Sequence, residues 1–80
     1  MIGIIGLGYV GLPLVNATAR AGFRVTGFDI DPAKIDLLNR GRSYIDAVPD
    51  FAIDGHRRAG RFHATMDFTE IANCDVVVIC

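Results

Sequence analysis

The first 19 residues of this 80-residue sequence carry no charged side chain, and the whole chain has a formal net charge of only −1. Proteins that bind nucleic acid or anionic lipid through their surface need a basic patch, and this composition supplies none. We therefore expect no nucleic-acid partner and no electrostatic attachment to a membrane.

Cysteine is also scarce, with only Cys74 and Cys80. Neither belongs to a C-x-x-C pair and no histidine stands at ligand spacing, so we predict no metal site. Free cysteines of this kind are typical of the reducing cytoplasm, which is the location we expect. No Ser-His-Asp arrangement can be assembled from the remaining residues.

The uncharged segment 2–19 is long enough to raise the question of a membrane span. It contains four glycines together with Pro13, Asn16 and Thr18, and no basic segment precedes it as a signal peptide would require. Its apolar residues also change from a strand-like to a helix-like pattern along the segment. We therefore predict a strand, a turn and a helix, and no membrane segment.

The hydrophobic pattern predicts alternating strands and helices along the rest of the chain. Strands are expected at residues 1–5, 23–30, 61–65 and 75–80, and helices at residues 9–21, 32–40, 51–59 and 67–73. This order favours an α/β, Rossmann-like parallel sheet of strand order 3-2-1-4, covered by helices. For the first helix, the sheet-facing side chains are expected to be Val10, Leu14, Val15, Ala17 and Ala21.

The last six residues, "DVVVIC", form an apolar run that ends the sequence without a turn or cap. A strand that is apolar on both faces needs neighbouring strands and covering helices. We therefore expect residues 1–80 to be a fragment, the N-terminal βαβαβαβ portion of a larger Rossmann-like domain.

The segment from Gly6 to Gly11 fits the pattern G-x-G-x-x-G between the first predicted strand and helix. In this pattern, Gly6 permits the tight turn, Gly8 lets a pyrophosphate approach the backbone, and Gly11 lets the helix pack closely. The start of the helix offers unpaired N–H groups and a positive dipole end to the phosphates. The pattern predicts a dinucleotide site.

Asp29 lies 18 residues beyond Gly11, at the end of the second predicted strand. A carboxylate at this place accepts hydrogen bonds from the adenosine ribose and repels a 2′-phosphate, which favours NAD over NADP. Asp31 is interpreted first as the cap of the helix that begins at Pro32, with ribose contact as the alternative. On spacing alone, Lys34 is a solvated lysine.

Other polar residues receive structural interpretations. His56 stands beside Arg57 and Arg58 on a stretch that we expect to be exposed, and His63 is expected to be packed or half-exposed in a short strand. Asp46 and Asp50 are explained by a polar loop better than by acid–base catalysis.

The segment "GLGYVGLPL" resembles the NAD-binding domain of the UDP-glucose/GDP-mannose dehydrogenase family. The resemblance continues through "GFRVTGFDIDPAKIDLLNRG", "GRFHATMDF" and "CDVVVIC", and so covers almost the whole chain. Within the family, "GLGYVGLPL" together with "GRSYI" followed by "VP" is most similar to bacterial enzymes that act on UDP-N-acetylhexosamines, especially UDP-N-acetylglucosamine 6-dehydrogenases of polysaccharide synthesis.

The resemblance implies that the parent protein oxidises the C6 alcohol of a UDP-sugar to a carboxylate, using two NAD⁺ and a covalent thioester on a cysteine. The implied parent is a homodimer or a larger oligomer, and its catalytic residues and sugar-binding domain lie outside these 80 residues. The family's cofactor contacts fall on a set of loop and strand-end residues and on a position that is often basic: Gly6, Gly8, Tyr9, Val10, Gly11, Asp29 and Lys34.

Two alternatives remain open from the sequence. The first is the NAD-binding part of a dehydrogenase of the β-hydroxyacid type, which shares a similar glycine loop. The second is a non-catalytic, NAD-sensing Rossmann module.

Overall fold

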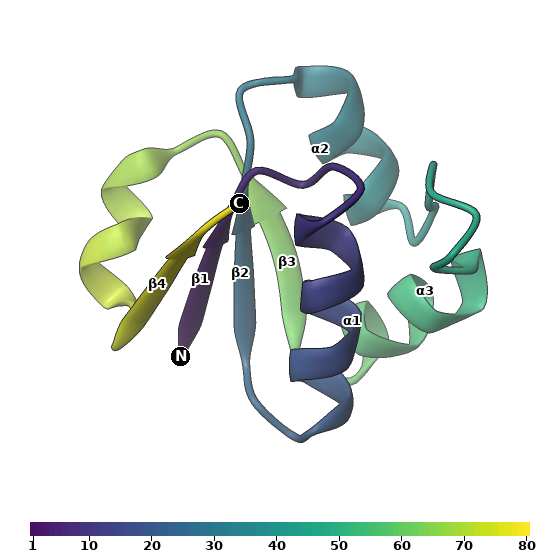
Figure 1. Ribbon diagram of the computed structural model, residues 1–80, viewed down its shortest axis with the longest axis horizontal. Helices are drawn as coiled ribbons and strands as arrows, with labels where there is room; N and C mark the ends of the chain where they lie inside the picture. Colours follow the sequence, from purple (N-terminus) through teal and green to yellow (C-terminus); the bar gives the residue numbers. More distant parts are fainter.

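Four short parallel strands form one sheet in the computed structural model, which describes all of residues 1–80 (Figure 1). The strands are β1 (Ile2–Ile5), β2 (Val25–Phe28), β3 (Phe62–Thr65) and β4 (Val76–Ile79). Their order across the sheet is β3-β2-β1-β4, which confirms the predicted topology. The carboxyl ends of all four strands therefore meet at the same edge, where open α/β sheets bind their ligands.

The helices are α1 (Gly11–Arg20), α2 (Pro32–Asn39), α3 (Asp50–Arg58) and the 3₁₀ helix η1 (Phe68–Asn73). Figure 1 shows α1, α2 and α3 on one side of the sheet, and the yellow-green η1 on the other. The chain moves outward from β1 to β2 to β3 and then returns to β4, so right-handed connections place the last crossover on the opposite face. No helix has the length and apolar character needed to cross a membrane.

The hydrophobic core lies between the sheet and the helices α1–α3. A cluster of 12 buried residues fills it, with Ile4 and Val25 from the sheet and Ile53 from α3 among its members. The buried residues of α1 are Gly11, Leu12, Val15 and Ala19. The face predicted for this helix was right for Val15, which is buried, and for Leu14, which packs against the core, but wrong for Val10, Ala17 and Ala21, which are exposed. Because α1 begins at Gly11 and not at residue 9, Val10 lies before its first turn and is 70% exposed.

The other face of the sheet is covered more sparsely. Phe68 of η1 packs against Phe28, with 5.6 Å between the ring centroids. β4 pairs only with β1, and its side chains Val76, Val77 and Ile79 are exposed.

Gly55 lies in the middle of α3, where a glycine weakens the sequence-based prediction of a helix. A Cβ built on Gly55 meets no atom within 4 Å. Replacing a helical glycine by alanine removes conformational freedom from the unfolded chain. We therefore expect Gly55→Ala to raise the free energy of unfolding by about 0.5–1 kcal/mol in urea titrations.

Gly60 provides the matched control. It has equally open surroundings, but its φ is +72°, which disfavours any residue with a Cβ. Gly60→Ala should therefore destabilise the fold. If both variants shifted the urea midpoint in the same direction, the helical assignment of Gly55 would be contradicted.

Candidate functional site

The turn from β1 to α1 is built by two glycines in contact. Gly6 has a φ of +92°, and its N–H donates to the Phe28 carbonyl at 2.8 Å. A Cβ on Gly11 would lie 1.7 Å from the Gly6 carbonyl oxygen, so only glycine allows α1 to begin this close to the loop. The predicted requirement for close packing at Gly11 is therefore met, with the loop carbonyl as the neighbouring group.

The loop leaves a row of backbone donors without protein partners. The N–H groups of residues 8–11 donate to no acceptor in the chain, whereas the next amide, that of Leu12, donates to the Gly8 carbonyl at 3.1 Å. Val10 at the N-cap provides no side-chain hydrogen bond, and the first turn of α1 holds no acidic residue. Free N–H groups at a helix start, with the dipole behind them, attract an anion.

Gly8 differs from the other two glycines of the motif. Its φ is not positive, and an added Cβ would meet nothing within 4 Å. The packing of the chain therefore gives no reason for glycine at this position. The space beside it is open, as the glycine motif requires where a pyrophosphate is expected to approach the backbone.

Asp29 follows β2 and is tied to the glycine loop. Its Oδ2 accepts the Leu7 N–H at 2.9 Å, and its Oδ1 accepts the Asp31 N–H at 3.0 Å. Partial burial acts to raise the pKa of Asp29, but these N–H donors and the charge of Lys34 together outweigh it and lower the pKa below its ordinary value. The carboxylate is thus ionised at neutral pH, and each oxygen has a lone pair left for a ligand hydroxyl.

Lys34 lies in the first turns of α2 and reaches the same region, with its Nζ 5.6 Å from the centre of the Tyr44 ring. Asp31 caps α2 by accepting the Ala33 N–H at 2.9 Å, which confirms the first interpretation of that residue.

Tyr44 is the residue of this region that the sequence did not single out. Its hydroxyl donates to the Leu7 carbonyl, 37 residues away along the chain. Burial, and then the charges of Asp29 and Asp31, raise the pKa of Tyr44, so the phenol stays protonated and able to donate. This hydrogen bond could not be predicted from the sequence, because its acceptor is a backbone atom that lies near the tyrosine only in the folded chain.

All seven predicted site residues line one cleft of about 320 Å³ at the carboxyl edge of the sheet. Leu7 and Cys80 complete its wall. Tyr9 is 84% exposed, so its side chain is free of the core. The loop, the strand end and the second helix thus converge on one site, although they are far apart in sequence.

The remaining candidates lie elsewhere. The expectation that His56 is exposed was wrong: it is 7% exposed, because α3 packs on α1 and its Nε2 meets Asn16 Oδ1 at 2.9 Å. His63 is half-exposed, with its Nε2 2.9 Å from Glu70 Oε1. Asp50 accepts the Ser43 N–H in the loop before α3. No group of three His, Cys, Asp or Glu side chains is placed to hold a metal ion.

The parallel sheet, the glycine turn with free amides, and the acid after the second strand define a dinucleotide-binding Rossmann domain. Comparison with known families shows which family of Rossmann domains the chain resembles. Residues 1–80 match the model of the UDP-glucose/GDP-mannose dehydrogenase family, NAD binding domain, and the chain belongs to this family. The match decides against a dehydrogenase of the β-hydroxyacid type.

Individual relatives agree with this assignment. The chain is 36% identical to GDP-mannose 6-dehydrogenase of Pseudomonas aeruginosa, over 99% of the chain and 19% of the relative. It is 45% identical to UDP-N-acetyl-D-mannosamine dehydrogenase of Escherichia coli over 64% of the chain and 12% of that protein. The chain thus spans about a fifth of the length of the first relative.

Solved structures of relatives share the fold. The crystal structure of a ternary complex of the Pseudomonas aeruginosa GDP-mannose dehydrogenase superposes with a TM-score of 0.93 at 37% identity, covering 99% of this chain and 19% of that one. The UDP-D-ManNAc dehydrogenase of Pyrococcus horikoshii gives a TM-score of 0.91 at 30% identity, with the same coverage.

The Tyr44 contact can be tested by removing one atom. Tyr44→Phe leaves the Leu7 carbonyl without its donor, so we expect the free energy of unfolding to fall by about 1 kcal/mol in urea titrations. Tyr9→Phe is the matched control, because the Tyr9 hydroxyl makes no hydrogen bond in the chain and is exposed. Equal stability losses in the two variants would contradict the role given to Tyr44.

Proposed function

We propose that this cleft binds the ADP half of NAD⁺, with the pyrophosphate on the free amides of residues 8–11 and the adenosine ribose on Asp29. The observation that carries the proposal is Gly8, whose glycine identity serves no packing within the chain but leaves open space beside four unpaired N–H donors. Backbone donors at a helix start bind phosphate without a charged side chain.

Each remaining residue of the cleft has a part in this proposal. The ionised Asp29 accepts the ribose hydroxyls and disfavours a 2′-phosphate, which makes the site selective for NAD⁺ over NADP⁺. Lys34 stands beside that carboxylate and contacts the ribose edge. The exposed side chains of Tyr9 and Val10 flank the phosphates. Asp29 also holds the loop in place through the Leu7 N–H at 2.9 Å.

We further propose that residues 1–80 form the N-terminal part of the NAD-binding domain of a cytoplasmic nucleotide-sugar 6-dehydrogenase, itself a homodimer or larger. Its sugar is a UDP-N-acetylhexosamine, whose C6 alcohol becomes a carboxylate with water as the second oxygen source. When bound, NAD⁺ accepts a hydride from the carbon being oxidised, and two equivalents are needed for the four electrons removed. The family match supports a nucleotide-sugar dehydrogenase. The Escherichia coli relative named for UDP-N-acetyl-D-mannosamine supports the choice of sugar, whereas the Pseudomonas aeruginosa relative is named for GDP-mannose.

Gly8→Ala is the sharpest test of the cofactor site. The added methyl group meets no protein atom, so the free energy of unfolding should change by less than about 1 kcal/mol. It occupies the space proposed for the pyrophosphate, so the Kd for NAD⁺ should rise by about tenfold or more in calorimetric titrations.

The chosen control for this variant is Gly55→Ala, which also adds a methyl group in open space but lies on α3, outside the cleft. Its Kd for NAD⁺ should equal that of the unaltered protein. NAD⁺ binding that is unaffected by Gly8→Ala would overturn the proposed pose.

The proposed activity is tested on the protein that carries this chain. With NAD⁺ in excess, we expect two NADH per UDP-N-acetylhexosamine molecule, measured by absorbance, and slower reduction with GDP-mannose. Faster turnover of GDP-mannose would reassign the sugar. NAD⁺ binding without reduction by any of these sugars would instead support a sensing module.

A further inference from the structure

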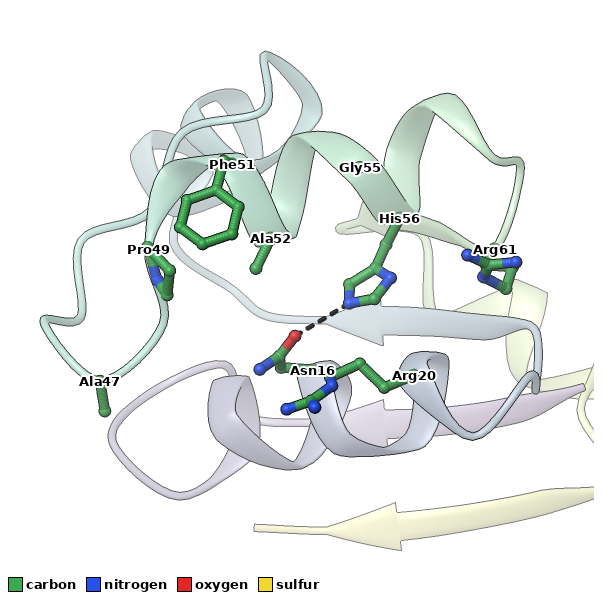
Figure 2. A pocket seen from close by; sticks show the side chains of 9 residues that line it. All are labelled: Asn16, Arg20, Ala47, Pro49, Phe51, Ala52, Gly55, His56 and Arg61. Carbon is green, nitrogen blue, oxygen red and sulfur yellow. Dashed lines mark hydrogen bonds between the residues drawn. The ribbon is translucent and has the colours of Figure 1, made fainter.

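A second and larger pocket, of about 590 Å³, lies between α1 and α3, away from the cofactor cleft. Figure 2 shows Asn16 on α1 facing His56 on α3, with the Arg20 side chain running beside Asn16, Pro49 and Phe51 at one end of the pocket and Arg61 at the other. Its volume lies in the range of pockets that hold small organic molecules.

The charges in this pocket are all positive and are not neutralised by the protein. Arg20 and Arg61 line it and have no carboxylate within salt-bridge distance, and no acidic residue is part of its wall. The arginines that follow His56 behave differently, because both Arg57 and Arg58 pair with Asp54. Two arginines therefore line one pocket without a counter-charge.

The buried polar atoms of the pocket also lack an acceptor or a negative charge. The Nε of Arg61 is buried and has no hydrogen-bond partner. An N–H donor that is withdrawn from water in this way costs free energy unless an acceptor is supplied. The imidazole of His56 forms a hydrogen bond with Asn16, and burial, followed by the charges of Arg61 and Arg20, lowers the pKa of His56. The surroundings of the imidazole are thus electropositive.

The opposite end of the pocket is apolar. Pro49, Ala52 and Phe51 form this end, and Phe51 is 79% exposed although it is a large aromatic residue. A planar or aliphatic group resting here would cover the ring, while an anion on the same molecule reaches the arginines.

We propose that the pocket between α1 and α3 binds a small organic phosphate, with the phosphate on Arg20 and Arg61 and an apolar or aromatic group on Pro49 and Phe51. Guanidinium groups offer paired N–H donors that match phosphate oxygens, and two of them balance a phosphate dianion. This site is separate from the cofactor cleft and does not depend on the proposed enzymatic activity.

The test uses phenyl phosphate as the probe and amide NMR shifts of residues 16–20 and 47–61 as the readout. We expect saturable shifts in these segments, with a Kd about tenfold lower than that of inorganic phosphate. Phenol, which carries the ring without the charge, should give no saturable shift. The absence of saturable shifts with phenyl phosphate would overturn the proposal.

Variants separate a built site from general charge attraction. Arg20→Gln should raise the Kd for phenyl phosphate about tenfold, and Phe51→Ala should raise it while leaving inorganic phosphate binding unchanged. The side chains of Arg20 and Phe51 are exposed, so their replacement should leave the fold intact. Arg24→Gln is the control, because Arg24 also lacks an ion pair but does not line the pocket. An equal effect of Arg20→Gln and Arg24→Gln would overturn the proposal in favour of unspecific attraction.

Discussion

The contact between Gly11 and the Gly6 carbonyl is the constraint on which the rest of the site depends. Because a Cβ on Gly11 would lie 1.7 Å from that oxygen, α1 can begin directly above the end of β1 only with glycine there. This placement points the free N–H groups of residues 8–11 to the carboxyl edge of the sheet. It also brings Leu12, Val15 and Ala19 onto the core. One steric requirement therefore serves both packing and binding.

Asp29 and Tyr44 fix the loop that this contact creates. Asp29 accepts the N–H of Leu7, and Tyr44 donates to the carbonyl of the same residue. Both backbone polar groups of Leu7 are therefore hydrogen-bonded to side chains from other parts of the chain. The residue just before Gly8 is thus anchored, which limits the movement of the donors that follow it. Preorganised donors bind an anion with less ordering cost than mobile ones. Asp29 is therefore a structural residue as well as a proposed ligand of the ribose.

Much of the fold, and the grouping of the seven candidate residues around one cleft, could be predicted from the sequence, because both depend on local signals. Glycine spacing, strand-like apolar runs and the cap at Asp31 are read within a few residues. The predictions that were wrong concern contacts between residues far apart in the sequence. The prediction for α1 was wrong at Val10, Ala17 and Ala21 because the first residue of the helix is decided by the Gly6 contact. The burial of His56 follows from α3 packing on α1. The bond of Tyr44 to a backbone carbonyl left no trace in composition or spacing.

The molecule presents two electropositive sites that differ in their source of charge. At the glycine loop the donors are backbone N–H groups, whose partial charges need no counter-ion and persist in every state of ionisation. Between α1 and α3 the donors are full guanidinium charges, left unpaired while Arg57 and Arg58 share Asp54. An unpaired guanidinium with a buried Nε is destabilising unless an anion meets it, whereas the free amides of a helix start remain accessible to water. The two sites thus differ in what would hold an anion, backbone N–H groups at the first and side-chain charges at the second, and the family relationship concerns only the first.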